Sequence, residues 1–206
     1  MTSPLYHIAD ELRAIANMGL RHAANDYDRD RYERVLALSA RLVAELDSRD
    51  PGEVLAVYRE SFNHVSPYIG ASAAVFRDKR ILLMKRHDNG LWAMPGGLTE
   101  VGESWAESAL RELREEVGLE GRAVRLLGVF DTRLWGGINK SQVYRGVFEI
   151  EVGPDSEPTI SAEAVDVGFF AEDGLPPLSP GHIKTVPLVL RQVRGEAAVP
   201  YFDTPA

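Results

Sequence analysis

The sequence contains no cysteine among its 206 residues. This absence excludes disulfide bonds, thiolate catalysis and any zinc site built on cysteine ligands. Long apolar runs are missing too, because no stretch approaches the roughly 18 residues that a membrane span needs. The first 15 residues contain acids and an arginine, where a signal peptide needs an uninterrupted apolar core. We therefore expect a cytoplasmic protein without a membrane span.

Positive charge is also scarce. The chain has 23 Lys and Arg against 31 Asp and Glu, which gives a formal net charge of −8. A non-specific nucleic-acid binder usually presents a basic face, so the composition argues against a nucleic-acid partner. An acidic protein that handles phosphate groups needs a cation as an intermediary.

Residues 1–65 are predicted to form a helical domain. Ile8, Leu12 and Ile15 are spaced like one face of a helix, and the same periodicity returns between residues 32 and 46. Pro51 suits the first turn of a third helix. Three helices of this size bury only a small core. We expect them to pack on the rest of the chain or on a second subunit, which favours a homodimer.

Residues 66–206 are predicted to form a second domain in which strands outnumber helices. The pattern predicts a strand–turn–strand unit over 69–87 with its turn near Asp78–Lys79, a short strand that ends in a turn at Gly96–Gly97, further strands over 123–133, 142–152 and 165–170, and helices over 103–117 and 180–195. Two helices flanking several strands indicate a mixed α+β layer structure.

The segment GGLTEVGESWAESALRELREEVGL, residues 96–119, concentrates acidic side chains on a predicted helix. Glu112, Glu115 and Glu116 share one helix face, where like charges repel. A charged run of this kind is often only a solvated helix face. Three convergent carboxylates, however, are stabilised by a hard divalent cation such as Mg²⁺ or Mn²⁺. The Gly96–Gly97 backbone can approach a ligand closely, and one of its carbonyl groups is a further candidate ligand.

The spacing decides between these interpretations. From Gly97 the residues fit G-x5-E-x7-R-E-U-x-E-E-x-G-U, where U is aliphatic. Seven identities have a chance rate on the order of 10⁻⁶ over a chain of this length. This pattern is the signature of the Nudix hydrolases, and the sequence resembles that family without a departure inside the pattern.

The resemblance implies an α/β/α sandwich with a mixed sheet, preceded here by the small helical domain. It implies that Glu112, Glu115 and Glu116 hold Mg²⁺, with Mn²⁺ as the alternative. In the same reading the carbonyl of Gly96 or Gly97 assists and Glu103 supports the metal site, while Arg111 orients Glu115. The base that removes a proton from water varies in the family, and Glu112, Glu115 or Glu163 could serve here. Asp166 ranks behind Glu163, and the alternative for Glu163 is a solvated loop acid.

Residues outside the signature resemble a bacterial subgroup with a similar helical extension, whose dimeric members are described as ADP-ribose or CDP-choline pyrophosphatases. The implied reaction splits the diphosphate of a nucleoside diphosphate linked to X, and gives a nucleoside monophosphate and phosphorylated X. Two alternatives remain open. One is a nucleoside triphosphate pyrophosphohydrolase with the same chemistry, and the other is a Nudix-fold ligand sensor without turnover.

Several side chains outside the signature are candidate substrate contacts. Arg86, Arg133 and Lys140 could meet phosphates or a sugar, and Trp92, Phe130, Trp135 and Tyr144 could stack on a base. The alternative for Trp92 and Phe130 is a place in the core, where large aromatic side chains are mostly found. The five histidines are scattered without metal-ligand spacing, and none is assigned a catalytic role.

Overall fold

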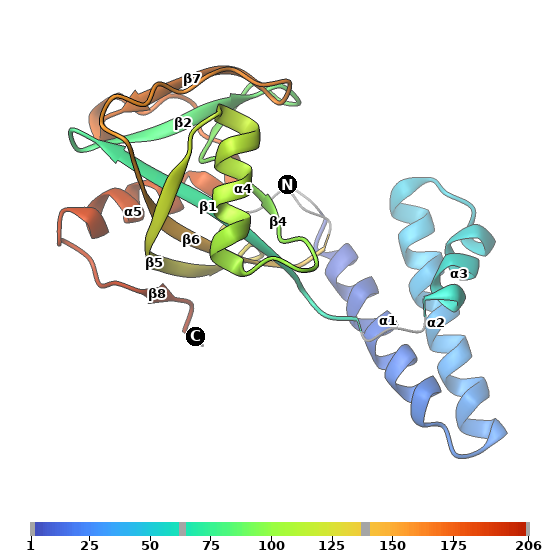
Figure 1. Ribbon diagram of the computed structural model, residues 1–206. Helices are drawn as coiled ribbons and strands as arrows, with labels where there is room; N and C mark the ends of the chain where they lie inside the picture. Colours follow the sequence, from blue (N-terminus) through green and yellow to red (C-terminus); the bar gives the residue numbers. More distant parts are fainter. Residues whose placement is uncertain (1–2, 62–64, 137–140, 205–206) are drawn as a thin grey trace. The chain divides into compact units, whose positions relative to one another are not determined.

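The computed structural model describes residues 3–61, 65–136 and 141–204. Contacts divide the chain into two compact units, one of residues 1–67 with 139–142 and one of residues 68–138 with 143–206. The first break follows residue 67, close to the boundary predicted after residue 65. Figure 1 labels the elements of both units.

The first unit is helical, as the sequence predicted. Its helices are α1 (Leu5–His22), α2 (Asp26–Asp47) and α3 (Pro51–Glu60). The Asn25 side chain caps α2 by accepting a hydrogen bond from the Asp28 amide at 2.8 Å, and Asp50 caps α3 by accepting from the Gly52 amide at 2.8 Å. Small and aliphatic side chains form the core between the helices, including Ala9, Ala16, Leu36 and Ala40.

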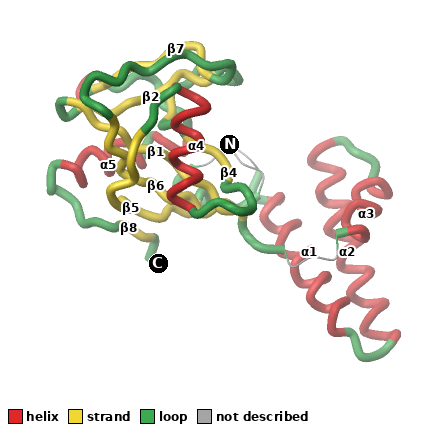
Figure 2. The backbone as a smooth tube through the Cα atoms, in the orientation of Figure 1, coloured by secondary structure: helices red, strands yellow, loops and turns green. Residues whose placement is uncertain are grey.

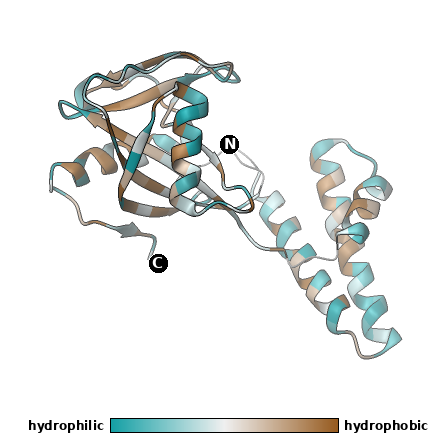
Figure 3. Ribbon diagram, viewed as in Figure 1, coloured by the Kyte–Doolittle hydropathy of each residue, from teal (hydrophilic) through white to brown (hydrophobic). Residues whose placement is uncertain are grey.

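Helix α1 also carries an apolar stripe that stays exposed. Leu5, Ile8, Ile15 and Met18 are 40%, 47%, 50% and 38% exposed. Their spacing places them on one side of the helix, and Figure 3 shows apolar and polar residues interspersed along the helices of this unit. An exposed stripe of this kind is typical of a surface that meets a partner.

The second unit is built around a mixed sheet, whose described strands are β1 (Tyr68–Arg77), β2 (Arg80–Arg86), β3 (Trp92–Ala93), β4 (Gly96–Leu98), β5 (Gly121–Asp131), β6 (Val143–Val152), β7 (Ala164–Phe170) and β8 (Tyr201–Phe202). The strand order is β3-β2-β1-β6-β5-β8, with β4 paired to β1 and β7 paired to β2. Strands β1 and β6 run parallel, as do β5 and β8, and the other pairs are antiparallel. Figure 2 shows these strands in yellow.

Helices cover both faces of this sheet, which confirms the predicted α+β sandwich (Figure 1). Helix α4 (Trp105–Val117) buries Leu113 and Val117 in a cluster with Ala71 and Val75 of β1. Helix α5 (Thr185–Val193) buries Val186 and Leu190 in a second cluster on the other face. Among the described helices, none combines the length and the apolar character that crossing a bilayer requires.

The predicted hairpin over 69–87 is confirmed. Strands β1 and β2 are joined by Asp78 and Lys79, whose φ angles are 49° and 61°. Two consecutive residues with positive φ define the tight turn that matches the right-handed twist of an antiparallel pair.

Two other predictions were wrong in detail. Gly96–Gly97 is not a free turn, because residues 96–98 form strand β4 against β1. The predicted helix over 180–195 begins only at Thr185, and a 3₁₀ turn, η2 (Pro180–His182), precedes it. Pro187 was expected near the first turn of this helix, and this is confirmed, since a missing amide hydrogen is tolerated there. Strand β8 was not predicted.

Candidate active site

Helix α4 carries the acidic residues and has well-defined ends. At its start the Ser104 hydroxyl accepts a hydrogen bond from the Glu107 amide at 3.3 Å, and the Glu107 carboxylate accepts from the Ser104 amide at 2.7 Å. This reciprocal pair is a capping box. At its end Gly118 adopts a left-handed conformation with φ of 68°, which glycine takes without steric cost. The helix therefore holds its carboxylates at defined positions.

The three glutamates that the sequence placed on one face differ in exposure. Glu112 and Glu116 are only 9% and 5% exposed, whereas the Glu115 side chain is 53% exposed. Burial raises the pKa of Glu116 to about 8, against an opposing hydrogen bond from the Gly96 amide. Burial also raises the pKa of Glu112, although Arg111 opposes the shift. Both carboxylates are therefore costly to ionise without a further cation.

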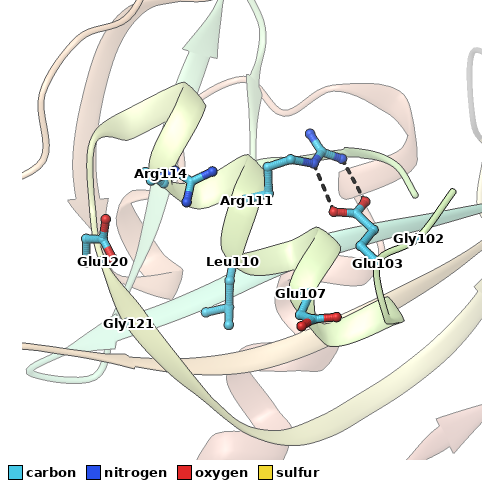
Figure 4. A pocket seen from close by; sticks show the side chains of 8 residues that line it. All are labelled: Gly102, Glu103, Glu107, Leu110, Arg111, Arg114, Glu120 and Gly121. Carbon is cyan, nitrogen blue, oxygen red and sulfur yellow. Dashed lines mark hydrogen bonds and ion pairs between the residues drawn. The ribbon is translucent and has the colours of Figure 1, made fainter. Parts of the chain in front are cut away.

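Arg111 connects the carboxylates of the signature. Its Nε and Nη2 donate to the two oxygens of Glu103 at 3.0 Å each, and its Nη1 donates to Glu112 at 2.9 Å and to Glu115 at 3.1 Å. Figure 4 shows the Arg111–Glu103 pair. The guanidinium of Arg111 holds the pKa of Glu103 down at about 2. Arg111 thus acts as a common donor that fixes three carboxylates relative to one another.

The two glycines at the start of the segment allow strand β4 to lie very close to its neighbours. A β-carbon built on Gly96 would overlap the Ala71 carbonyl oxygen of β1, and one built on Gly97 would overlap the Glu112 carboxylate. The Gly96 amide donates to Glu116 Oε2 at 2.7 Å. The close approach therefore places the backbone of β4 directly beside both buried carboxylates.

The donor set of this region fits a hard divalent cation. Carboxylate and carbonyl oxygens are the ligands that Mg²⁺ prefers, and burial disfavours the ionised forms of Glu112 and Glu116 when no metal is bound. In the described residues no three acidic or histidine side chains are already arranged as a metal cage. The present partners explain this, because Arg111 holds Glu112 and Glu115 while the Gly96 amide holds Glu116. Metal binding would require these oxygens to change partners.

Glu163 lies directly before β7, opposite the end of β2. Its backbone carbonyl accepts a hydrogen bond from the His87 amide at 3.0 Å, and its side chain is exposed. Its charge contributes to the raised pKa of both Glu112 and Glu116. Asp166 is paired in register with Lys85, and its carboxylate accepts from the Val167 amide at 2.9 Å. The fold thus brings Glu163 toward the carboxylates of α4.

The predicted substrate contacts fall into different surroundings. Phe130 is 2% exposed and Trp92 is 9% exposed, and both pack in the core cluster beneath α5. Trp135 packs edge-on against Phe130 and donates to Asp203 Oδ1 at 2.6 Å. Tyr144 is 40% exposed and keeps an accessible ring. Of the four aromatic candidates, Tyr144 has the environment that best suits stacking on a ligand.

Two of the predicted cationic contacts are paired with acids in the structure. Arg86 makes a two-pronged ion pair with Asp88 at 2.9 and 2.6 Å. Arg133 makes a similar pair with Asp131, with a shortest distance of 2.7 Å. Lys140 lies outside the described residues. The positive charge of Arg86 nevertheless interacts electrostatically with Glu116 and Glu163.

Two polar side chains of this region, Arg145 and His182, were not predicted. Arg145 of β6 lies on the same side of its strand as the buried Val143 and Val147, and its charge acts on Glu112 and Glu116. His182 of η2 is buried and lies within the influence of Arg145 and Arg86. A charged residue between two buried valines was a usable signal for Arg145. Nothing in the local sequence marked His182.

A cavity of about 430 Å³ runs along one side of α4. It is lined by Gly102, Glu103, Glu107, Leu110, Arg111, Arg114, Glu120 and Gly121, which Figure 4 labels. Neither Glu112 nor Glu116 lines it. The cavity therefore shares Arg111 and Glu103 with the acidic site without containing its two buried carboxylates.

Comparison with protein families assigns both units. The Nudix domain matches residues 66–189, and a UDP-X-like N-terminal oligomerisation domain matches residues 3–58. Since the Nudix match covers more than half of the chain and coincides with the unit that carries the acidic helix, the chain belongs to the Nudix hydrolases.

Individual relatives extend this assignment over nearly the whole chain. The putative ADP-ribose pyrophosphatase YjhB of Bacillus subtilis (strain 168) is 34% identical over 172 residues, which cover 84% of this chain and 83% of that protein. The crystal structure of a UDP-X diphosphatase is 30% identical with a TM-score of 0.62, covering 95% of this chain and 96% of that one. An ADP-ribose pyrophosphatase from Streptococcus suis 89-1591 is 30% identical with a TM-score of 0.57, covering 67% and 100%. This chain is thus a Nudix hydrolase similar to ADP-ribose pyrophosphatases and a UDP-X diphosphatase.

Proposed function

We propose that the protein hydrolyses the diphosphate bond of a nucleoside diphosphate linked to a small group X, with Mg²⁺ bound at the acidic helix. The carrying observation is the pair of buried carboxylates, Glu112 and Glu116, whose pKa values are raised by burial. A divalent cation bound there would favour their ionised form. ADP-ribose is the first candidate substrate, in line with the relatives of that name, and CDP-choline remains a second from the sequence pattern.

The proposed roles follow from the contacts of each side chain. Glu112, Glu115 and Glu116 would hold the metal, assisted by a carbonyl of Gly96 or Gly97. Bound Mg²⁺ supplies charge neutralisation at the diphosphate and acidifies water. Arg111 would keep the carboxylates in place, together with Glu103.

The proposed reaction also needs a general base that removes a proton from the attacking water. Glu163 is the exposed carboxylate that the fold brings toward the acidic helix, and an exposed carboxylate that is not committed to metal can take a proton from water. Glu112 and Glu115 remain alternatives. Among the substrate contacts, Tyr144 would stack on the base or pack on X, while Arg86 and Arg133 would first have to leave Asp88 and Asp131.

A UDP-linked compound is a third candidate substrate, beside ADP-ribose and CDP-choline. The similarity to the UDP-X diphosphatase spans 95% of this chain and includes the helical unit, which a short Nudix domain lacks. The substrate panel described next therefore compares adenosine, uridine and cytidine compounds.

The test is a substrate panel with Mg²⁺ and, separately, Mn²⁺. ADP-ribose, UDP-glucose, CDP-choline and a nucleoside triphosphate are each incubated in ¹⁸O-water, and products are identified by mass spectrometry. We expect cleavage of at least one nucleoside diphosphate–X compound to a monophosphate and phosphorylated X, with one ¹⁸O in the products. Exclusive cleavage of the triphosphate would replace the proposed substrate class. Binding without cleavage of any compound would favour the sensor alternative.

We also propose a homodimer in which the exposed stripe of α1 contacts a second copy. The stripe belongs to the unit matched by the oligomerisation domain, and its Leu5, Ile8 and Ile15 side chains are 40%, 47% and 50% exposed in the single chain. A partner surface would remove them from water at a gain of roughly 25 cal/mol per Å². A cytoplasmic location, expected from the composition, remains a prediction.

The double change Ile8→Glu and Ile15→Glu is expected to convert this dimer to a monomer. Each new glutamate would bury a charge without a partner, and the free-energy cost of this burial would exceed the stabilisation that a modest interface contributes. Sedimentation velocity gives the mass of each species. Val124→Glu, at a similarly exposed apolar position of β5 (45% exposed), is the control and should leave the mass unchanged. A wild-type protein that sediments as a monomer at micromolar concentration would disprove the dimer.

A further inference from the structure

Arg145 is a partly buried cation that lacks an acidic partner in the described residues. Its Nη1 donates to the Ala71 carbonyl at 3.0 Å and to the Ser72 hydroxyl at 3.1 Å. Neither acceptor carries a charge. Burial lowers the pKa of Arg145, and the field of Glu112 and Glu116 opposes that shift only in part. Buried charges in proteins are usually paired, so an uncompensated guanidinium is an unusual feature of this sheet.

The surroundings of Arg145 place it beside the glycine segment. Ser72 Oγ, which accepts from Arg145, would lie 2.6 Å from a β-carbon built on Gly96. Arg145 Nη2 and the Gly97 carbonyl oxygen would lie 3.4 and 2.8 Å from a β-carbon built on Gly70. The guanidinium of Arg145 and the backbone of β4 are therefore close neighbours on the same part of β1.

His182 is the second unsatisfied group of this region. Both of its ring nitrogens are buried and have no hydrogen-bond partner in the part of the chain that the structure describes. The turn that carries it is anchored to β3, since the Ser179 amide donates to the Trp92 carbonyl at 2.8 Å and the His182 amide donates to the Ser179 carbonyl at 2.7 Å. Burial, with the charges of Arg145 and Arg86, lowers the pKa of His182 to about 3. The neutral ring keeps one N–H donor that nothing uses.

We infer that Arg145 and His182 form a subsite for a phosphate group of the substrate, with Arg86 adding positive charge from the end of β2. This inference rests on the proposed function. A phosphate oxygen would accept from the unused N–H groups of both side chains, and charge-assisted hydrogen bonds of this kind are among the strongest in proteins. A cation bound at Glu112 and Glu116 would cancel the carboxylate field on Arg145. The guanidinium would then need an anion, so metal and phosphate would bind cooperatively.

Titration calorimetry with inorganic pyrophosphate and Mg²⁺ tests the subsite without turnover. We expect Arg145→Gln to weaken pyrophosphate binding by about 10- to 100-fold, the usual effect of losing a hydrogen bond to a charged group. Arg122→Gln is the matched control, because Arg122 is an exposed arginine of β5 that is paired with Glu151. Unchanged affinity in Arg145→Gln, or no binding to the wild type at millimolar pyrophosphate, would overturn the inference. If Arg145→Gln does not fold, Arg145→Lys takes its place and should show a smaller loss.

His182→Leu separates a binding role from a structural one. Leucine fills an apolar site without unpaired nitrogens, so the melting temperature should rise by about 3 °C. Pyrophosphate binding should weaken several-fold in the same variant. A lower melting temperature with unchanged affinity would identify His182 as a packing residue and exclude it from the subsite.

The two hypotheses fail in different ways. If no compound in the substrate panel is cleaved but pyrophosphate binding still depends on Arg145, the subsite stands and the proposed reaction fails. If a nucleoside diphosphate–X compound is cleaved and Arg145→Gln changes neither KM nor pyrophosphate affinity, the reaction stands and the subsite fails.

Discussion

Replacing Glu116 by glutamine is expected to abolish hydrolysis while making the metal-free protein more stable. Glutamine keeps an oxygen that can accept from the Gly96 amide but removes the negative charge. Loss of a metal ligand removes several kcal/mol of transition-state stabilisation, which corresponds to a decrease in kcat of about 10³-fold or more. The gain in stability follows from the raised pKa of Glu116.

The size of this gain in stability depends on pH. The pKa of Glu116 is about 8 in the metal-free folded protein and 4.5 in the ordinary reference state. Folding therefore takes up a proton between these values. The contribution of this carboxyl to stability is complete below pH 4.5 and is lost as the pH rises to about 8. At pH 7 the glutamine variant avoids a cost of about 3 kcal/mol, so its melting temperature should exceed that of the wild type.

Urea unfolding between pH 5 and pH 9 in the presence of a chelator measures this difference. The wild type should lose stability relative to Glu116→Gln as the pH rises. Mg²⁺ must displace the proton of Glu116, so the affinity of the wild type for Mg²⁺ should increase up to about pH 8. Glu120→Gln, at an exposed carboxylate four residues further on, is the control and should change neither activity nor stability. Full activity in Glu116→Gln would remove this residue from the metal site.

Gly97→Ala is expected to lower kcat by about 10²-fold with a small effect on stability. The added methyl group would overlap the Glu112 carboxylate, which is the far end of a flexible side chain and can move aside. Such a movement breaks the 2.9 Å hydrogen bond from Arg111 and displaces a proposed metal ligand. A misplacement of about 1 Å in a catalytic group can cost this much in rate.

Gly96→Ala provides the contrast, since its methyl group would meet the backbone of Ala71 and Ser72 as well as the Ser72 hydroxyl. Strand β4 would have to separate from β1, and we expect a loss of about 1–3 kcal/mol or more in the free energy of unfolding. Gly174→Ala is the control, because a β-carbon there meets nothing within 4 Å. Steady-state kinetics and thermal unfolding of the three variants separate the effects. Wild-type kcat in Gly97→Ala would show that Glu112 tolerates displacement.

The local sequence was sufficient where local interactions decide the structure. The helix over 103–117 was predicted within two residues of its observed start, because the helical spacing of its apolar residues and the glycine at position 118 are local features. The turn at Asp78–Lys79 was predicted because two polar residues separate two apolar runs. Strand β4 was not, since Gly96 and Gly97 suggest a turn on local grounds alone. Their pairing depends on contact with β1, some 25 residues earlier in the chain.

The environments of the candidate side chains depended on hydrogen-bond and ion-pair partners that the sequence pattern did not reveal. Trp135 looked free in a glycine-rich loop, but Asp203, near the other end of the domain sequence, accepts its indole hydrogen. Arg86 and Arg133 looked available for phosphate, whereas nearby aspartates hold both.

By itself the sequence determined the chemistry of the acidic helix, the family and the division into a helical unit and a mixed sheet. These follow from residue identity and short-range spacing, because residues three or four positions apart in a helix lie on the same face. Only the tertiary structure decided that Glu112 and Glu116 are buried while Glu115 is not. It also decided that Arg145 lies near both buried carboxylates and donates to the uncharged oxygens of Ala71 and Ser72. Burial and charge compensation depend on strands and turns that are far apart in the chain, and so they arise only when the sheet is assembled.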